Sequence, residues 1–399
     1  MKILVIHNTY QQSGGEDVVA EAEVLMLRNA GHQVVMYHRS NNEINNFEWQ
    51  EKIIFPKQVI WAKKAIHDLR GIIYKEKPDA AHFHNTFLMI SPAAYYACQE
   101  AGVPVVQTLH NYRLLCPAAT FFREGRVCED CLGHTLPWPG VLHACYRGSR
   151  AETALVASML TFHHQAGTWQ KKVDVYIALT EFARRKFIEG GLPPEKIVVK
   201  PNFLNQDPGI GESEREYAVF VGRLSTEKGL RTLLKAWLTL KEIPLKIIGD
   251  GPMTDEIKMF VKTNQLENSI NILGRCSRQE VYAQIKGSRF LVFPSEWYEG
   301  FPITILEVFA CGKPVIASQL GAMAEIIKDG KTGLFFEVGN SGDLASKVRQ
   351  LLKNPQAYAE MGKNARVEFE TKYTAEKNYE MLMRIYEKAI ASAKGKSSG

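Results

Sequence analysis

The chain has 399 residues, of which 45% are hydrophobic and 23% are charged, and its formal net charge is +6. This composition excludes a largely disordered chain, and the length predicts two or three domains, each with its own core. The small positive excess favours anionic ligands but does not indicate nucleic acid as a partner. No apolar run is long enough for a transmembrane helix, and the short apolar run near the start predicts a strand rather than a signal peptide. We therefore expect a cytoplasmic protein.

Short β-branched runs alternate with amphipathic stretches in the first half of the chain. The predicted strands are 2–7, 32–38, 79–85, 103–110, 173–180 and 196–202. The predicted helices are 17–30, 57–75, 92–101 and a long stretch from Glu152. Strands separated by helices of this length predict right-handed βαβ units and a parallel sheet.

The second half repeats this alternation after a stretch rich in Gly, Pro and charge at 203–216, where we place the linker between domains. Its predicted strands are 217–222, 244–251, 270–274, 289–295 and 313–319, and a helix at 374–393 precedes a frayed tail. The resulting fold class is α/β, with two doubly wound domains. The predicted ranges are 1–203 with a Cys-rich insertion at 116–146, 204–375, and a C-terminal helix and tail at 376–399 that pack back on the first domain.

The stretch from Ser295 to Glu307 follows a predicted buried strand and leads into a helix. Pro302 suits the first helical position, where its missing N–H is not needed. Backbone N–H groups at a helix start form an anion site, and carboxylates beside it can accept charge-assisted hydrogen bonds from sugar hydroxyls. Glu299 and Glu307 could instead be solvated surface charges. The flanking Gly, Phe and Pro at a strand-to-helix turn favour a binding site.

A second polar stretch, GRLSTEKG, follows the first strand predicted in the second half. It carries Arg223 and Lys228 and ends where a helix begins near Leu230. The planar fork of an arginine and the mobile charge of a lysine are the usual pair for a diphosphate. Ordinary surface cations are the alternative. The second predicted domain thus has two anion-binding devices at strand ends.

Two adjacent glycines follow the first strand of the chain. Gly14 and Gly15, after Ser13, would let a ligand approach the backbone closely. The neighbouring Glu16 is a poor neighbour for a pyrophosphate, and the GxGxxG motif of dinucleotide-binding proteins is absent. The pattern therefore disfavours a dinucleotide oxidoreductase.

Histidines end two further strands of the first half. His84 ends the strand at 79–85, and His110 with Asn111 ends the strand at 103–110. A lone histidine at such a place is more often structural. Two of them at strand ends of one sheet favour a substrate pocket, because ligands bind at the carboxyl ends of parallel strands.

Together these motifs resemble those of the GT-B glycosyltransferases, specifically the large retaining group-1 family (glycosyltransferase family four) that includes sucrose synthases and bacterial mannosyl- and glucosyltransferases. EGFPITILE matches the Glu-x7-Glu motif of that family, GRLSTEKG lies upstream of it, and IGDGP lies between the two. The resemblance covers essentially the whole chain. It implies the GT-B fold, two doubly wound Rossmann-like domains whose parallel sheets face each other across a cleft.

The resemblance also implies residue roles. Arg223 and Lys228 would bind the donor diphosphate and neutralise the leaving group. Glu299 would bind hydroxyls of the donor sugar, Glu307 would hold the ribose hydroxyls, and His110 would contact the sugar near its reacting face. The other implied donor-binding residues are Gly14, Gly15, Gly274, Arg275, Phe301, Ile303 and Thr304. The acceptor-side candidates, chosen from their positions near strand ends, are Glu16, His84 and Asn111.

Members of this family transfer a sugar from a nucleotide diphosphate with retention of configuration and without a catalytic metal, so the resemblance implies no cofactor for catalysis. A double displacement would need a carboxylate nucleophile. Because Glu299 and Glu307 are assigned to hydroxyls, a front-face mechanism is the hypothesis. Pro302 differs from the commoner EGFGLP form of the motif and removes one backbone donor.

The expected reaction is hexosyl transfer from a nucleotide-sugar donor to a glycan or lipid-linked acceptor in bacterial polysaccharide synthesis. UDP-glucose is the favoured donor and GDP-mannose the second candidate. A nucleotide-sugar epimerase or hydrolase on the same scaffold is one alternative. A catalytically silent subunit of a polysaccharide assembly system is another, although the four charged residues of the two motifs are all present.

Four of the seven cysteines lie in the insertion with the spacing C-x11-C-x2-C-x13-C. They are Cys116, Cys128, Cys131 and Cys145. In a cytoplasmic protein this spacing favours a thiolate metal site over disulfides, and tetrahedral structural zinc is the specific hypothesis. His134 and His143 are substitute ligands, and four reduced thiols without a metal remain an alternative.

The same insertion contains LPWPGVLHACYRGSR, in which aromatic residues are interleaved with arginines. Such a segment could contact a membrane that carries a lipid-linked acceptor, on the cytoplasmic face of a bacterial inner membrane. Ordinary packing with solvated cations explains the same pattern, so both interpretations stand.

Overall fold

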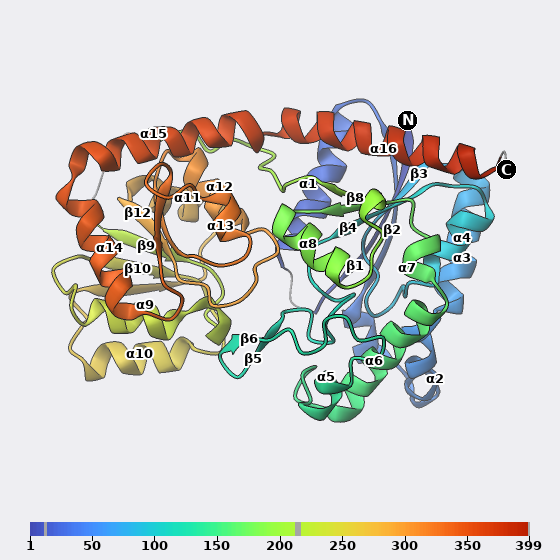
Figure 1. Cartoon of the computed structure of the whole chain (residues 1–399), viewed down its shortest axis with the longest axis horizontal. Coiled ribbons are helices and arrows are strands. Elements are labelled where there is room, and N and C mark those ends of the chain that lie inside the picture. The colour runs from blue at the N-terminus through green and yellow to red at the C-terminus, as the bar shows by residue number, and fades with distance from the viewer. Residues whose placement is uncertain (12–13, 212–216, 398–399) are drawn as a thin grey trace. The chain divides into compact units, whose positions relative to one another are not determined.

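The structure is a computed structural model that describes residues 1–11, 14–211 and 217–397. It forms two compact units (Figure 1). Unit 1 consists of Met1–Phe121, Glu129–Asn205 and Ala375–Gly399, and unit 2 consists of Phe122–Cys128 and Gln206–Thr374. The Cys-rich insertion is therefore divided between the units, although the sequence placed all of it in the first domain. Ser13 and part of the expected linker lie outside the described residues.

Unit 1 contains a parallel sheet of six strands in the order β2-β1-β3-β4-β7-β8. Its strands are β1 (Lys2–Thr9), β2 (Gln33–Ser40), β3 (Ala80–Asn85), β4 (Val105–Leu109), β7 (Val175–Ala178) and β8 (Ile197–Val199). β3, β4 and β7 are buried along their whole length, as expected for central strands covered on both faces. The order reverses between β1 and β3, so the crevice of this sheet opens at the carboxyl ends of those strands.

Helices α1 and α16 lie beside each other on one face of this sheet (Figure 1). Val5 of β1, Val106 of β4, Leu27 of α1 and Leu382 of α16 share one hydrophobic cluster there. The helices of unit 1 are α1 (Gly15–Asn29), η1 (Asn41–Asn46), α2 (Trp49–Ile60), α3 (Lys63–Glu76), α4 (Ala94–Glu100), α5 (Trp138–Leu142), α6 (Arg150–Gln165), α7 (Thr168–Lys171), α8 (Glu181–Glu189), η2 (Pro194–Lys196) and α16 (Ala375–Ser397). The closing helix is thus longer than the sequence predicted.

The predicted helix 57–75 is wrong as a single element, because the structure has two helices there. α2 ends at Ile60, and Trp61 adopts an extended backbone conformation. The indole ring of Trp61 packs on Tyr96, with ring centroids 5.0 Å apart, and stacks on His163 at 6.0 Å. This tertiary contact interrupts a stretch that is helical by its local pattern.

Unit 2 contains a second parallel sheet of six strands in the order β11-β10-β9-β12-β13-β14. Numbered from β9, this is the 3-2-1-4-5-6 order of dinucleotide-binding folds. Its strands are β9 (Ala218–Val221), β10 (Leu245–Ile248), β11 (Ile270–Gly274), β12 (Phe290–Phe293), β13 (Val315–Ser318) and β14 (Gly333–Phe336). Its helices are η3 (Thr226–Lys228), α9 (Leu230–Trp237), α10 (Thr254–Thr263), α11 (Arg278–Gly287), α12 (Ile303–Ala310), α13 (Met323–Ile326), α14 (Ser341–Lys353) and α15 (Pro355–Lys372).

Three strands escaped the sequence analysis. β14 begins at Gly333, and glycine weakens a strand pattern. A side chain there would place its Cβ 2.0 Å from the carbonyl oxygen of Val315 on β13, which explains why glycine occupies the position. The other two, β5 (Phe122–Arg123) and β6 (Arg126–Val127), form a short antiparallel hairpin inside the insertion.

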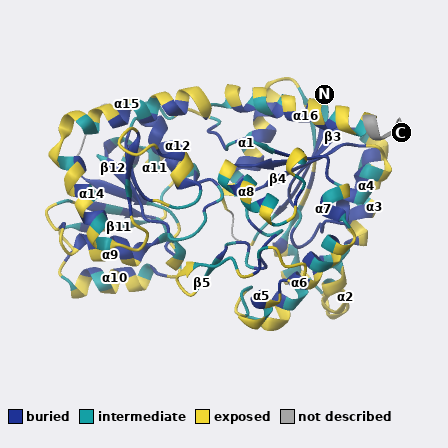
Figure 2. Cartoon of the chain, in the orientation of Figure 1, coloured by how far each residue is buried: buried dark blue, intermediate teal, exposed yellow. Residues whose placement is uncertain are grey.

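The core of each unit lies around its sheet, and exposed residues lie mainly on the outer helices (Figure 2). Trp237 is the largest fully buried side chain of unit 2 and donates from its indole N–H to the Ile243 carbonyl. Among the described residues, no helix combines the length and apolar character needed to cross a membrane.

Candidate functional site

The two charged motifs of unit 2 follow β9 and β12, which are neighbours in the sheet. The strand order reverses between these two strands, so their connections leave in opposite directions and open a crevice at their carboxyl ends. The loop after β9 carries Arg223 and Lys228. The loop after β12 carries Ser295 and Glu299.

Gly229 explains why these two loops can touch. Its φ of +69° lies in the left-handed region, and a Cβ would lie 1.8 Å from the carbonyl oxygen of Pro294. Only glycine allows the backbone after Lys228 to pass this close to the end of β12. The backbone N–H of Glu296 then donates to the carbonyl oxygen of Glu227 at 2.8 Å.

Lys228 and Glu299 form an ion pair where the loops meet. The Lys228 ammonium donates to Glu299 Oε1 at 2.7 Å, and the Ser295 hydroxyl donates to the same oxygen at 2.5 Å. The side chain of Lys228 is 19% exposed and that of Glu299 is 8% exposed. An ammonium has three N–H donors, so Lys228 can keep this pair and still bind an anion. Ser295 therefore belongs to this candidate site, and its place at a strand end could have indicated it.

The loop after β12 leads directly into α12. Pro302 is the N-cap of this helix and not its first residue, which corrects the sequence prediction. The first two helical residues are Ile303 and Thr304, and the N–H groups of a first helical turn have no partner within the helix. They can therefore bind an anionic or polar ligand. The ring of Phe301 instead packs on Tyr373, with centroids 5.9 Å apart.

Glu307 lies inside α12 with its carboxylate buried. Burial raises its pKa to about 7, against the opposing effects of Arg278 and of a hydrogen bond with Tyr282. Both partners come from α11, and the sequence analysis missed them because nothing local links that helix to the motif. A carboxylate with this pKa gains from donors such as a ribose diol, since these stabilise its charged form.

Arg223, Gly274 and Arg275, which the sequence analysis also assigned to the donor, lie at the carboxyl ends of strands in unit 2. Arg223 is exposed after β9, and Arg275 is exposed after β11. Gly249 follows β10 and has a φ of +140°, and a Cβ on this residue would lie 1.9 Å from the Gly222 carbonyl oxygen. Gly274 adopts a φ of +71° and accepts a hydrogen bond from the Gly249 N–H. These glycines hold the β9, β10 and β11 loops together beside the two arginines.

In unit 1, Gly14 is the N-cap of α1 and its N–H donates to Asp17. No described protein atom lies within 4 Å of a Cβ built on Gly14 or Gly15, and neither residue has a positive φ. Packing and backbone strain therefore do not require these glycines, whereas the close approach of a ligand would.

Glu16 follows the glycines, and its carboxylate accepts from the side-chain amides of Asn85 and Asn111, both at 3.0 Å. Burial, and then the charge of Asp17, raise the pKa of Glu16 to about 8. Glu16 is therefore mostly protonated at neutral pH. This removes the charge repulsion that made it a poor neighbour for a phosphate in the sequence analysis.

His84 and His110 are in contact, with His84 Nδ1 3.0 Å from His110 Nε2. His84 is buried, and His110 is half-buried. Both line a pocket of about 520 Å³ at the carboxyl ends of β3 and β4, together with Asn111, Arg113 and Tyr95. Three residues that the sequence analysis singled out, His84, His110 and Asn111, thus line one pocket.

The cysteine-rich insertion folds around Gly140 in unit 1. A Cβ on Gly140 would lie 3.3 Å from Cys131 Sγ and 3.0 Å from Pro117, the residue after Cys116. The Cys145 N–H donates to the Gly140 carbonyl at 3.0 Å. The Cys131 thiol therefore lies close to Gly140, and the backbone of Cys145 is hydrogen-bonded to this glycine. None of these cysteines is in a disulfide.

Both halves of this chain match known protein families. Residues 205–368 match the family described as glycosyl transferases group 1, and residues 13–207 match glycosyltransferase family 4. An uncharacterised glycosyltransferase of Methanocaldococcus jannaschii is 34% identical over 216 residues, which cover 54% of this chain and 59% of that protein. N-acetyl-alpha-D-glucosaminyl L-malate synthase of Bacillus anthracis is 28% identical over 402 residues, which cover 97% of each.

Among solved structures, Anabaena HepE in complex with UDP superposes with a TM-score of 0.70. The match covers 96% of this chain and 99% of that chain at 18% identity. At this identity the likeness establishes the fold, with two Rossmann-like units, and leaves the chemistry to the residues described above.

Proposed function

The chain belongs to the group-1 glycosyltransferases of GT-B fold, and from that premise we propose that it transfers a hexosyl group, with retention, from a nucleotide diphosphate sugar to a glycan or lipid-linked acceptor. UDP-glucose is the favoured donor and GDP-mannose the second. The observation that carries the proposal is the Lys228–Glu299 ion pair at the point where the strand order of unit 2 reverses. This pair puts a cation and a hydroxyl acceptor side by side where nucleotides bind in such sheets.

The donor would be held by charge and by backbone donors. Lys228 and Arg223 neutralise the diphosphate as it leaves, which is electrostatic stabilisation of the transition state. Glu299 accepts from hydroxyls of the sugar, and Ser295 holds its carboxylate in place. Glu307 accepts from the ribose diol. The free N–H groups of Ile303 and Thr304 replace the donor that Pro302 lacks.

Retention is proposed to follow a front-face route, in which the leaving phosphate takes the proton of the acceptor hydroxyl as the new bond forms. Glu299 is engaged with Lys228 and Ser295, and Glu307 lies buried in α12. Neither carboxylate is therefore assigned as a nucleophile. In unit 1, His110 contacts the reacting sugar, and the pocket beside it, with Glu16 and Asn111 at its edge, receives the acceptor.

The proposal is tested with a panel of UDP- and GDP-sugars, each supplied with and without glycan and lipid-linked acceptors. We expect acceptor-dependent release of nucleoside diphosphate and a product whose anomeric configuration matches that of the donor by NMR. An inverted product would refute the front-face route. Donor consumption without a glycosylated product would refute transfer and favour the hydrolase or epimerase.

The insertion is proposed to hold one structural zinc through Cys116, Cys128, Cys131 and Cys145. The spacing C-x11-C-x2-C-x13-C supports this proposal, since zinc prefers four such sulfur ligands in structural sites. Among the described residues, the one group of three metal-ligating side chains within 4.8 Å of one another does not include these cysteines, so binding would require the thiols to move closer together. The metal would hold together a segment that has little regular secondary structure.

Metal analysis of the purified protein is expected to find about one zinc per chain, as a single four-thiolate site requires. Cys131→Ser is expected to lose the metal. The control Cys276→Ser, which alters a cysteine outside the insertion, is expected to retain it. Wild-type protein purified without stoichiometric zinc would end the hypothesis.

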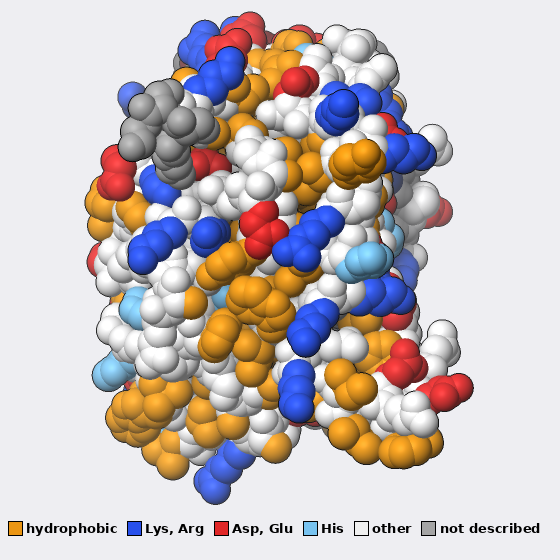
Figure 3. Space-filling model, turned by 90° about the vertical axis from the view of Figure 1, so that its right-hand side faces the viewer, with side chains coloured by type: hydrophobic (Ala, Val, Ile, Leu, Met, Phe, Trp, Pro, Cys, Tyr) orange, Lys and Arg blue, Asp and Glu red, His pale blue; other side chains and the backbone are white. Residues whose placement is uncertain are grey.

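A lipid surface is proposed to contact the exposed apolar side chains of α2, α5 and α6 in unit 1. Figure 3 shows hydrophobic side chains gathered along the lower edge of the face of unit 1 that it presents, with lysines and arginines among them. Those on or beside these three helices are Trp49, Ile53, Ile54, Leu136, Trp138, Leu142 and Phe162, between 44% and 68% exposed. Large exposed apolar patches mark interaction sites, and aromatic residues favour the membrane interface.

Sedimentation with vesicles tests this contact. The wild-type protein is expected to bind vesicles containing anionic lipid, and the double variant W49S/W138S is expected to remain in the supernatant with its thermal unfolding unchanged. Tyr74→Ser, which removes an aromatic ring that is 85% exposed on α3, is the control and is expected to bind as the wild type does. A wild-type protein that does not sediment with the vesicles would refute the proposal.

A further inference from the structure

Three neighbouring strands of unit 1 have a histidine in or just after their carboxyl-terminal part, and these histidines lie on the same face of the sheet. Along a strand every second side chain shares a face. His7 therefore lies on the face of Val5, His84 on the face of Ala80, and His110 on the face of Val106, the side covered by α1 and α16. Helix α1 brings Glu23 to this face, and α16 brings Asn378 and Tyr386.

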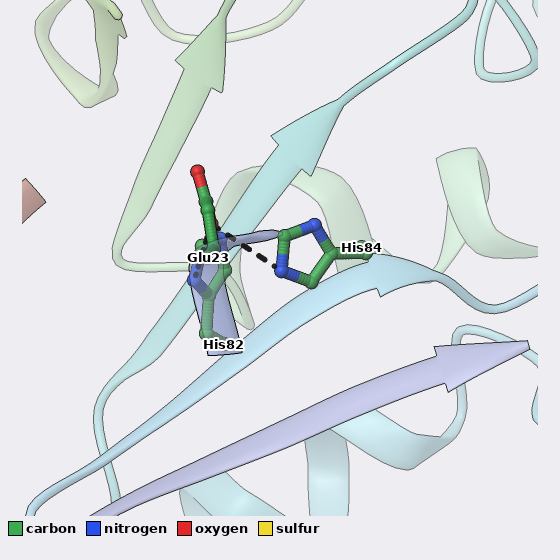
Figure 4. Close-up of side chains that lie close together, drawn as sticks. All are labelled: Glu23, His82 and His84. Atoms are coloured by element: carbon green, nitrogen blue, oxygen red, sulfur yellow. Dashed lines mark ion pairs between the residues drawn. The ribbon is translucent and has the colours of Figure 1, made fainter. Parts of the chain in front are cut away.

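These side chains form a continuous polar row that ends at His110. His110 Nε2 lies 3.0 Å from His84 Nδ1, and His84 Nε2 lies 3.5 Å from Glu23 Oε2 (Figure 4). The other oxygen of Glu23 accepts from the Lys200 ammonium at 2.5 Å, and Lys200 also donates to Asn378 Oδ1 at 2.9 Å. Among the described residues, Glu23 Oε2 and His84 Nε2 have no hydrogen-bond partner, so the contact between them is electrostatic rather than a hydrogen bond.

Glu23, His82 and His84 have donor atoms within 4.8 Å of one another, a spacing that could hold a metal ion. Two observations argue against it. Both ring nitrogens of His82 are already in hydrogen bonds of 2.8 Å, to Tyr386 and Thr108. Lys200 already neutralises Glu23, so a divalent ion would add uncompensated charge to a fully buried site. The cluster is better explained as a row of polar contacts, in which Glu23 and His84 interact electrostatically at 3.5 Å.

The charge of Glu23, at the end of the row opposite His110, determines where the protons of the two histidines lie. Burial raises the pKa of Glu23, but Lys200 outweighs this effect and leaves it below the ordinary value, so the carboxylate is ionised. Burial lowers the pKa of His84 well below the ordinary value and that of His110 to about 3. Both rings are therefore neutral, and each carries one proton on one of two nitrogens.

We propose that Glu23 acts through His84 to fix the tautomer of His110, so that His110 offers the lone pair of Nδ1 to a hydroxyl of the substrate. The negative charge of Glu23 favours a proton on the ring nitrogen that faces it, so it places the proton of His84 on Nε2. His84 Nδ1 is then a lone pair, and it accepts from the N–H of His110 Nε2. Among the described residues, this is the only hydrogen bond of the His110 ring, which leaves Nδ1 available in the pocket.

Glu23 and His84 are therefore positioning residues, and only His110 would touch the substrate. This inference rests on the proposed glycosyl transfer, in which His110 faces the reacting sugar. The prediction of proton positions does not depend on any substrate, and it can be measured on the protein alone.

The test is an NMR spectrum of the full chain labelled with ¹⁵N-histidine, because ring nitrogens with and without a proton have distinct shifts. In the wild type we expect the proton on Nε2 of both His84 and His110. In Glu23→Gln the side-chain oxygen should remain on Lys200, which only donates, so the amide N–H₂ faces His84. His84 Nε2 must then accept, and we expect the protons of both rings to move to Nδ1.

The kinetic counterpart is a loss of at least tenfold in kcat/KM for Glu23→Gln, because His110 Nδ1 becomes a donor. Tyr386→Phe is the matched control: it removes a hydroxyl that contacts His82 in the same cluster, and it is expected to leave both tautomers unchanged. A wild-type His110 protonated on Nδ1, or tautomers unmoved in Glu23→Gln, would overturn the inference. Correct tautomers in a protein that transfers no sugar would instead contradict only the proposed function.

Discussion

Replacing Lys228 by alanine is expected to lower kcat/KM for the nucleotide-sugar donor by about 100-fold, or about 2.7 kcal/mol of transition-state stabilisation. The charge that the leaving diphosphate develops would lose one of the two cations assigned to it in unit 2. Glu299, whose side chain is only 8% exposed, would also lose its partner at 2.7 Å. A buried carboxylate left alone repels an anionic donor, so both effects act in the same direction.

Steady-state kinetics of donor turnover measure this loss in kcat/KM. Two further variants serve as a control and as a second test of the ion pair. Lys235→Ala removes an exposed lysine from α9 of the same unit, and it is expected to leave kcat/KM within twofold. Glu299→Gln keeps the shape of the side chain and is expected to cost at least tenfold. Lys228→Ala turnover equal to that of the wild type would refute the assignment of this pair to the donor.

The donor side of the site could be predicted from sequence because its parts are local. Glu299 and Pro302 lie in one strand-to-helix connection, Glu307 lies in the helix that follows it, and Lys228 lies in the connection after another strand. In a parallel sheet, strand ends meet at one edge, so the strand pattern already brings such residues together. What it could not give was the direct pairing of Lys228 with Glu299, which depends on the backbone approach at Gly229.

The polar row of unit 1 could not be predicted in the same way. Glu23 and Lys200 are 177 residues apart, and Lys200 and Asn378 are 178 apart. Glu23 belongs to an amphipathic helix, where a glutamate is ordinarily expected in solvent. Periodicity tells which face of an element is buried, but not which charged residue of another element will meet it there.

Prediction from the local sequence pattern also failed where contacts with distant residues determine the backbone conformation. The stretch 57–75 has helical periodicity throughout, yet the packing of Trp61 on Tyr96 and His163 divides it. β14 was missed because its first residue is the glycine that β13 requires. In both places a neighbour distant in sequence selects the conformation.

The buried Lys200–Glu23 ion pair of unit 1 gives the second prediction with a large expected effect, a loss of stability. Lys200→Met is expected to lower the free energy of unfolding by about 3–5 kcal/mol, because it leaves an unpaired carboxylate in the core. Lys200 and Glu23 are both 1% exposed in their side chains and 2.5 Å apart. Urea denaturation of the full chain measures this loss. The free energy of unfolding is taken from the transition of unit 1, which contains α1 and α16.

Two comparisons separate charge from packing in this result. Arg70→Ala breaks an ion pair of 2.6 Å whose side chains are 57% and 54% exposed, and it is expected to cost less than about 1 kcal/mol. Adding Glu23→Gln to Lys200→Met removes the unpaired charge and should recover a large part of the lost stability, which gives the pair an interaction energy. If Lys200→Met cost no more than Arg70→Ala, Glu23 would not be ionised in the folded protein, and the proton order proposed for His84 and His110 would lose its basis.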